Sequence, residues 1–464
     1  MGSGTNARTI RELEELVEIR SRRLHLLRRR AATYGIDARP EDLMEIEDIE
    51  KEIAEFERQL ERLRRAKSEI TGPEQHQGYL TLNLRFSSRE PSDYEVLLQS
   101  DVGDAVGGFS LPLTDKDLHD LRLDVSRAGT TRETRRRERS SQVLGRLTEL
   151  GQQLYEALPA VIKERYQSAR DKASAEGYGG VRLRLTFADP CLILVPWECL
   201  YEPGRREFLG LSIQTPIVRY AELPYPPPTS LEFRPPLRIL AVLSNPCDLT
   251  PLDGKRERQR IASALRELEA NGQVSVRWLE AAESGEPTSL EKLHDALFAF
   301  RPQVLHFVGH GDFDSQRSEG HLYFEGTGGE NDPVSSWRLA QLAASTGSLR
   351  LVFLNACRGA KTAEIDQLSG VAMALVQKGI PAVIGMQFEI TDGAAIEFAS
   401  KFYQRLAQGA PVDTAVQEAR IHLRVVKHNL LEWATPVLYL WPRDGQVFRV
   451  KRPDLGPGGG EDGE

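Results

Sequence analysis

The 464-residue sequence lacks the features that mark membrane, secreted and zinc-binding proteins. It has no uninterrupted apolar run of about 18 residues, the length that a membrane-spanning helix needs, and no signal peptide at its start. Its four cysteines show no CxxC spacing, which favours reduced thiols over a disulfide framework or a zinc site. We therefore expect a cytoplasmic protein with no membrane partner, no metal and no other cofactor.

Two further absences narrow the possible ligands. The net charge of −8 argues against nucleic acid as the main partner, because nucleic-acid-binding domains carry an excess of basic residues. The sequence also contains neither GxGxxG nor a Walker P-loop string. A flavodoxin-like nucleotide-binding protein is therefore only a weak alternative.

The composition, 40% hydrophobic and 28% charged, is that of a globular protein too long for a single ordinary core. Breaks rich in proline and glycine divide the sequence into four parts. We expect a helical hairpin over 1–73, an α+β part over 74–230, an α/β core over 231–452, and a Gly-rich, acidic, disordered tail over 453–464.

The first part shows two heptad-like apolar patterns separated by a turn that contains Gly35 and Pro40. This pattern predicts an antiparallel, coiled-coil-like hairpin. Each helix has one apolar seam, so the hairpin needs something to pack against. It is either an adaptor or self-association module, or a spacer packed on its own chain.

The second part begins with a run of alternating polarity at Leu80–Phe86, which predicts a strand. A long amphipathic helix is expected over Ser140–Ala169, followed by strands at Val181–Phe187 and Leu192–Pro203. The basic stretch 132–139 favours a solvated loop or the start of a helix.

The third part alternates strand and helix periods, which predicts right-handed βαβ units and a mostly parallel sheet between two layers of helices. The predicted strands are Leu237–Leu243, Val274–Glu280, Val304–Gly311, Leu349–Cys357, Ala382–Met386 and Val437–Trp441. The predicted helices are Gly254–Ala270, Ser289–Phe300, Ser336–Ala344, Leu368–Lys378 and Ala394–Ala407.

Two of these strands end on reactive residues next to a glycine, His310 and Cys357. The carboxyl ends of neighbouring parallel strands meet at one edge of a sheet, where ligands bind in open α/β folds. A thiol and an imidazole at one crevice suggest nucleophilic catalysis, with His310 as the proton carrier for Cys357. We expect both residues on loops at this edge.

The string Asn355-Ala356-Cys357-Arg358-Gly359, with His310 lying 47 positions before the cysteine, resembles the caspase signature. Together with VLHFVGHG and LRLVFLNAC, it resembles the bacterial CHAT family of caspase-like cysteine proteases. The resemblance continues to the WATPVLYLW segment and includes Pro-Trp-Glu at 196–198, where Glu198 is expected to be structural.

The resemblance implies a caspase-like fold and a cysteine endopeptidase that acts on protein substrates. It also implies an oxyanion hole formed by the backbone N–H groups of Gly311 and Cys357, and a role as an activated effector in defence or stress signalling. Caspase-like enzymes do not require a third catalytic side chain, so no residue is assigned to that role.

Alternative interpretations of the site remain open. His306 could replace His310, although its position within a strand favours a structural role. A metal site of His306, His310 and His321 would need a fourth ligand. The main alternative for the whole protein is an inactive caspase-fold scaffold that binds partners without cleaving them.

In this family architecture, the loops after the third and fifth core strands line the pocket for the residue before the scissile bond. These loops carry mainly acidic side chains, which would favour a basic substrate residue. The candidates are Asp312, Asp314, Gln387, Glu389 and Asp392.

Overall fold

The computed structural model describes Ile49 and residues 78–451, apart from a few short gaps. The gaps are 91–92, 131–132, 225, 253, 315–318, 356–366, 389 and 427–430. The predicted hairpin over 1–73, except for Ile49, and the tail over 453–464 lie outside the described residues. The elements below belong to one compact unit, apart from the last two residues of α5.

Within the described residues, 11 strands form a single sheet in the order β10-β9-β11-β15-β16-β17-β7-β4-β1-β2-β3. The sheet therefore joins strands of the second and third predicted parts of the sequence. The bounds are β1 Leu80–Glu90, β2 Asp93–Gln99, β3 Ala105–Ser110, β4 Val181–Phe187, β7 Ile217–Tyr220, β9 Leu237–Leu243, β10 Val274–Leu279, β11 Val304–Val308, β15 Leu351–Asn355, β16 Ala382–Met386 and β17 Pro436–Leu440.

The strands that carry the candidate site are parallel and buried. β10, β9, β11, β15 and β16 run in one direction, and β17 runs antiparallel to β16. Every residue of β11 is buried, as is expected for a strand covered on both faces. The predicted α/β fold with a mostly parallel central sheet is confirmed.

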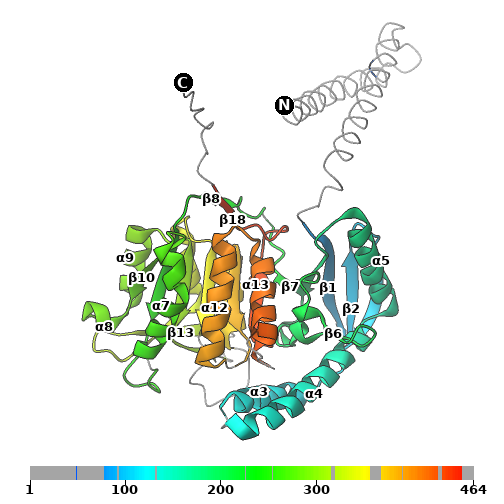
Figure 1. Cartoon of the computed structure of the whole chain (residues 1–464), viewed down its shortest axis with the longest axis horizontal. Helices are drawn as coiled ribbons and strands as arrows, with labels where there is room; N and C mark the ends of the chain where they lie inside the picture. The colour runs from blue at the N-terminus through cyan, green and yellow to red at the C-terminus, as the bar shows by residue number, and fades with distance from the viewer. Residues whose placement is uncertain are drawn as a thin grey trace, which may run out of the picture. The chain divides into compact units, whose positions relative to one another are not determined.

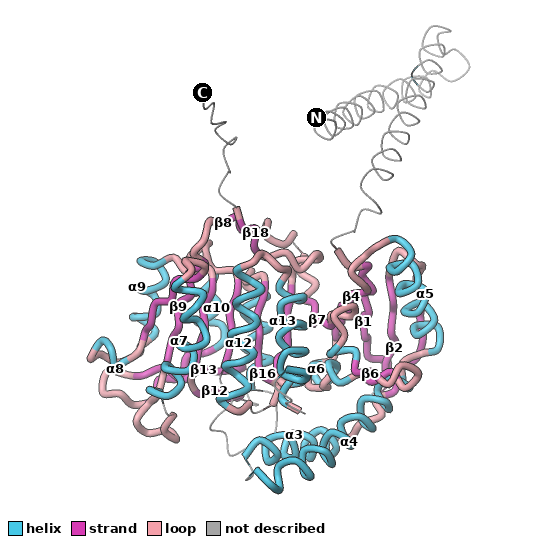
Figure 2. The backbone as a smooth tube through the Cα atoms, viewed as in Figure 1, coloured by secondary structure: helices cyan, strands magenta, loops and turns pink. Residues whose placement is uncertain are grey.

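Helices flank the sheet, and α7, α12 and α13 lie side by side across it (Figure 1). The tube view shows the strands continuing behind these helices (Figure 2). α10 packs against α11. The bounds are α3 Asp115–Thr130, α4 Glu133–Ala157, α5 Ala160–Glu176, α7 Gly254–Ala270, α9 Leu290–Phe300, α10 Ser336–Ser345, α11 Gln367–Gln377, α12 Asp392–Ala407 and α13 Val412–Ile421. None of the described helices is long and apolar enough to cross a membrane.

A small antiparallel sheet follows β11 directly. Its strands are β12 (His310–Asp314), β13 (Glu319–Glu325) and β14 (Asn331–Ser335), in that order. The expectation that His310 lies on a loop is therefore wrong, because His310 is the first residue of β12. Asp312 and Asp314 are also strand residues, and β12 pairs with β13 through Asp312 and His321.

Two predictions for the second part were wrong. The predicted helix Ser140–Ala169 is two helices, α4 and α5, which separate at Pro159 because proline cannot supply a backbone N–H to a continuous helix. The predicted strand at Leu192–Pro203 is not a single strand, because it contains the end of α6 (Pro190–Ile193), the 3-10 turn η2 (Trp197–Cys199) and the two-residue strand β5 (Tyr201–Glu202). Asp189 caps α6 by accepting a hydrogen bond from the Cys191 N–H.

Candidate active site

His310 lies where the central sheet passes into the small antiparallel sheet. Its side chain is buried, at 2% exposure, and its ring Nε2 lies 2.9 Å from the backbone oxygen of Thr250. Thr250 belongs to the connection between β9 and α7, and it precedes Pro251. Because proline restricts the preceding residue to extended conformations, the direction of the Thr250 carbonyl is constrained.

This hydrogen bond decides the tautomer of the neutral ring. A carbonyl oxygen can only accept, so Nε2 of His310 carries the hydrogen and donates it to Thr250. The other ring nitrogen, Nδ1, then holds a lone pair. An imidazole fixed in this way can accept a proton at Nδ1, which is the property that a general base needs.

The strand that leads to Cys357 is the neighbour of the strand that leads to His310. Val308 of β11 pairs with Asn355, the last residue of β15. The Gly309 N–H also donates a hydrogen bond of 3.4 Å to the Asn355 oxygen. Cys357 itself, two residues after Asn355, lies outside the described residues.

His306 lies in the core and has a different environment from His310. Its ring stacks on Phe353 with centroids 4.5 Å apart, and Nδ1 lies 2.9 Å from the Tyr403 hydroxyl. Complete burial lowers the pKa of His306 to about 3. The ring is therefore neutral at physiological pH. Its only polar contact among the described residues is with a tyrosine hydroxyl, which agrees with the structural role expected from the sequence.

Asp312 and Asp314 share one face of β12 with His310, since strand residues two apart point the same way. Both carboxylates are partly exposed. The Tyr323 hydroxyl donates to Asp312 over 3.4 Å, and burial together with the Asp312 charge raises the pKa of Tyr323. This face of β12 therefore carries negative charge next to the imidazole. Gly311, on the opposite face, is buried.

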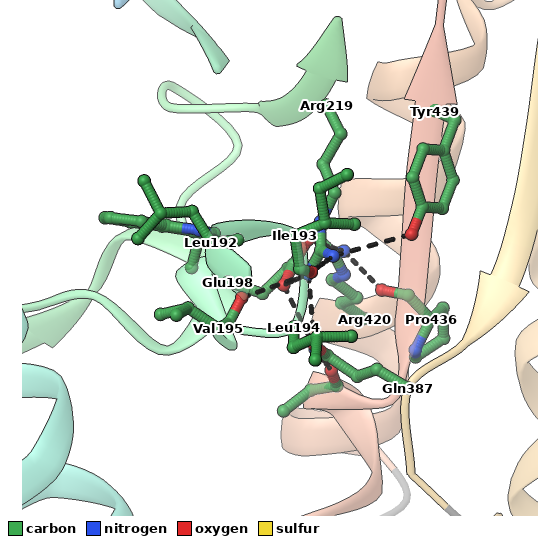
Figure 3. A network of polar contacts seen from close by, with 12 residues as sticks. Leu192, Ile193, Leu194, Val195, Glu198, Arg219, Gln387, Arg420, Pro436 and Tyr439 are labelled. Atoms are coloured by element: carbon green, nitrogen blue, oxygen red, sulfur yellow. Dashed lines mark hydrogen bonds and ion pairs between the residues drawn. The ribbon is translucent and has the colours of Figure 1, made fainter. Parts of the chain in front are cut away.

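Gln387 follows β16 and is buried in a polar network (Figure 3). Its side-chain amide donates to Glu198 over 3.0 Å and to the Ala434 backbone oxygen over 2.6 Å. Its amide oxygen accepts from Arg219 over 3.1 Å. The side chain thus holds the end of β16 in place. Of the other candidates after this strand, Glu389 and the side chain of Asp392 lie outside the described residues.

The network is built around one buried carboxylate and two buried guanidinium groups. Arg219 Nη2 lies 3.1 Å from Glu198 Oε2, and Arg420 Nη2 lies 4.0 Å from Glu198 Oε1. The three side chains are at most 1% exposed. Arg219 also donates to the Val195 oxygen, and Arg420 donates to the Pro436 oxygen. Desolvation lowers the pKa of Arg420. Glu198 is therefore structural, as the sequence suggested.

Two groups that hold the site together, the Thr250 carbonyl and the Arg219 side chain, were not predicted from the sequence. The Thr250 carbonyl has no signature, because every residue has a backbone oxygen. Arg219 does have one, since it is a charged residue in a strand whose preceding residues, Ile217 and Val218, are apolar and buried. Such a residue requires a buried partner. No group of three or more potential metal ligands occurs in the described part of the chain.

Comparison with known proteins gives one positive result. Residues 148–440, more than half of the chain, match the CHAT domain. No curated protein matches the sequence. The match spans the strands that lead to His310 and Cys357, the network around Glu198, and the helices that cover them. The chain therefore belongs to the CHAT domain family of caspase-like proteases.

Proposed function

We propose that the protein is a cysteine endopeptidase whose nucleophile is Cys357 and whose proton carrier is His310. One observation supports this most strongly: the residue before His310 is hydrogen-bonded to Asn355, two residues before Cys357. The strands that lead to His310 and to Cys357 are therefore neighbours in the sheet, as the proposal requires. The tautomer of His310 is the second support, because its Nδ1 carries a lone pair.

In the proposed mechanism, the thiol proton of Cys357 passes to Nδ1 of His310, and the sulfur attacks the carbonyl carbon of the scissile peptide bond. The backbone N–H groups of Gly311 and Cys357 stabilise the oxyanion, with each donor contributing about 3 kcal/mol. The proton on Nδ1 passes to the leaving amine as the C–N bond breaks, which leaves a thioester. A water then gives a proton to His310 and attacks the thioester, which releases the acid product and restores the thiol.

We propose that the preferred residue before the scissile bond is basic. Asp312 and Asp314 lie on the face of β12 that carries His310. Glu389 and Asp392 follow β16, which β15 separates from β11 in the sheet. Acidic side chains bind arginine or lysine through charge-assisted hydrogen bonds. Peptides ending in arginine should be cleaved faster than otherwise identical peptides ending in aspartate. Equal or reversed rates would reject this preference.

We propose that residues 1–73 form the adaptor or self-association hairpin, that 74–230 and 231–452 form the two parts of the protease region, and that 453–464 is a disordered tail. In this proposal the protein is a cytoplasmic effector that is activated in defence or stress signalling.

Size-exclusion chromatography with light scattering, on the full chain and on a chain lacking 1–73, tests self-association. If both proteins have the same number of subunits, and no partner is captured through 1–73, residues 1–73 act as a spacer.

The test of the catalytic proposal compares cleavage products of a cell extract treated with the wild type, Cys357→Ala and His310→Ala. Cys191→Ala and His294→Ala are matched controls, because both residues are exposed. New protein termini should appear with the wild type and both controls, and should be absent with Cys357→Ala and His310→Ala. An inactive scaffold requires that all five proteins give the same result.

A further inference from the structure

The carbonyl group that orients His310 is held by a set of hydrogen bonds at the base of the β9–α7 connection. The Asn245 side chain bridges this connection: its Nδ2 donates to the Leu252 oxygen over 3.0 Å, and its Oδ1 accepts from the Leu252 N–H over 2.9 Å. One carboxamide thus occupies both backbone groups of a residue seven positions away. Thr250, whose oxygen receives the His310 hydrogen bond, lies inside the loop that is closed in this way.

The start of this loop is fixed by a buried carboxylate, Glu325, which is 5% exposed and is the last residue of β13. Its Oε1 accepts from the Asn245 N–H over 2.9 Å, and its Oε2 accepts from the Thr288 N–H over 2.8 Å. Hydrogen bonds from backbone donors to an ionised carboxylate are among the stronger ones in proteins. Glu325 therefore attaches the residue that bridges the loop to the small antiparallel sheet.

The middle of the loop is attached to the same sheet. The Cys247 N–H donates to the Gly329 oxygen over 2.9 Å, in the turn between β13 and β14. Asp248 accepts a hydrogen bond of 2.8 Å from the Asn331 N–H, at the start of β14. Since β12 pairs with β13, His310 and the loop that contains Thr250 are both held by one three-stranded sheet. The distance between the His310 imidazole and the Thr250 carbonyl therefore depends on this three-stranded sheet.

We propose that Asn245 is a positioning residue for the catalytic imidazole, acting through the Thr250 carbonyl, and that Glu325 places Asn245 for this purpose. The inference rests on the proposed protease function. Without the Asn245 bridge, the loop of 245–252 loses the cross-link that closes it. The Thr250 oxygen then no longer selects the tautomer in which Nδ1 of His310 holds the lone pair.

The experiment uses the full chain labelled with ¹⁵N-histidine, in the wild type, Asn245→Ala and Asn245→Asp. The aspartate variant keeps the acceptor for Leu252 N–H but replaces the donor with a second oxygen that faces the Leu252 carbonyl. His310→Ala identifies the His310 signals among the nine histidines of the chain. Asn271→Ala, at an exposed position in the turn after α7, is the matched control.

Nitrogen shifts and two-bond couplings should report a pure Nε2–H tautomer for His310 in the wild type and in Asn271→Ala. Both Asn245 variants should show a mixture of tautomers. On a cleaved peptide, their kcat should fall by roughly three- to tenfold, the factor expected for one lost hydrogen bond, with KM changed less than about twofold.

A pure Nε2–H tautomer in both Asn245 variants would overturn the inference, whether or not the protein cleaves peptides. If the wild type itself shows a tautomer mixture and cleaves nothing, the premise that the Thr250 carbonyl fixes the His310 tautomer is wrong. If the wild type shows the pure tautomer but no cleavage, the proposed function fails while the positioning by Asn245 can still be measured. Circular dichroism and the other histidine signals show whether each variant has folded.

Discussion

Replacing Glu198 with alanine should be among the most destabilising single changes in this protein. Glu198 is fully buried between Arg219 and Arg420, and its carboxylate also accepts from the Gln387 amide. In Glu198→Ala, both guanidinium groups stay buried without the carboxylate that balances part of their charge. Removing one partner of a buried ion pair typically costs about 3–5 kcal/mol, because the remaining charge is desolvated and uncompensated.

The matched control is Glu222→Ala. Arg85 and Glu222 form an ion pair of 2.6 Å, shorter than the pair at Glu198, but their side chains are 55% and 56% exposed. Solvent screens such a pair, so its loss should change the free energy of unfolding by less than about 1 kcal/mol. The comparison therefore separates the effect of burial from that of distance.

Equilibrium unfolding in urea, followed by tryptophan fluorescence, measures both variants. Trp197 and Trp433 are completely buried and lie next to Glu198 and Ala434 in the sequence, so their emission reports on this region. The Gln387 backbone N–H donates to the Thr435 oxygen, so its rate of hydrogen exchange shows whether the loss of stability begins at the network around Glu198. If the free energies of unfolding of Glu198→Ala and Glu222→Ala differ by less than about 1 kcal/mol, the reasoning about buried charge is refuted.

Three further predictions follow from the structure. An unfolded histidine titrates near its ordinary pKa of about 6.5, whereas folded His306 stays neutral down to a pKa of about 3. The unfolded state therefore binds more protons between these values, and stability falls as the pH is lowered. His306→Phe should remove about 1.7 kcal/mol of the stability lost between pH 6.5 and 5, and urea unfolding curves that shift equally with pH in both proteins would contradict this. Gly151→Ala on α4 should destabilise the protein by about 1–3 kcal/mol, because the new Cβ would lie 2.0 Å from the Cys199 oxygen. Gly145→Ala on the same helix meets nothing within 4 Å and should stabilise the protein by about 0.5–1 kcal/mol. Thermal unfolding that ranks the two variants in the opposite order would disprove the close approach. Asp312→Asn should lower kcat/KM for arginine-ended peptides by about three- to tenfold and leave aspartate-ended peptides unchanged, and an equal loss for both would show that Asp312 does not select the substrate.

The core of the fold was predictable because its sequence signals are local. β9 and α7 have the predicted bounds, since an apolar run bounded by prolines and a helical pattern that begins at glycine mark their ends. The predicted helix that spanned Pro159 failed because the apolar period continues on both sides of the break. The segment after Asp189 failed because its apolar residues resemble a strand, while a capping carboxylate and Pro190 start a helix there.

The candidate site was predictable only in part, for a different physical reason. His310 stood out as a reactive residue after an apolar strand, and the register of β11 with β15 agrees with the expected neighbouring strands. The partner of its Nε2 is a backbone oxygen 60 residues away, which no side-chain pattern reveals. Gln387 was expected to line a pocket, and its hydrogen bonds to Arg219 and Glu198 follow only from the three-dimensional arrangement.

The two sides of the candidate site are held by different kinds of interaction. His310 is oriented by a backbone carbonyl in a loop that is fixed to the small sheet. The end of β16, from which the chain enters the segment carrying Glu389, is held by a buried charged network that draws on β7, η2 and α13. Because these two sets share no described residue, they can change separately. We therefore expect substitutions around Glu198 to alter which substrates are bound, and substitutions around Asn245 to alter the rate of the chemical step.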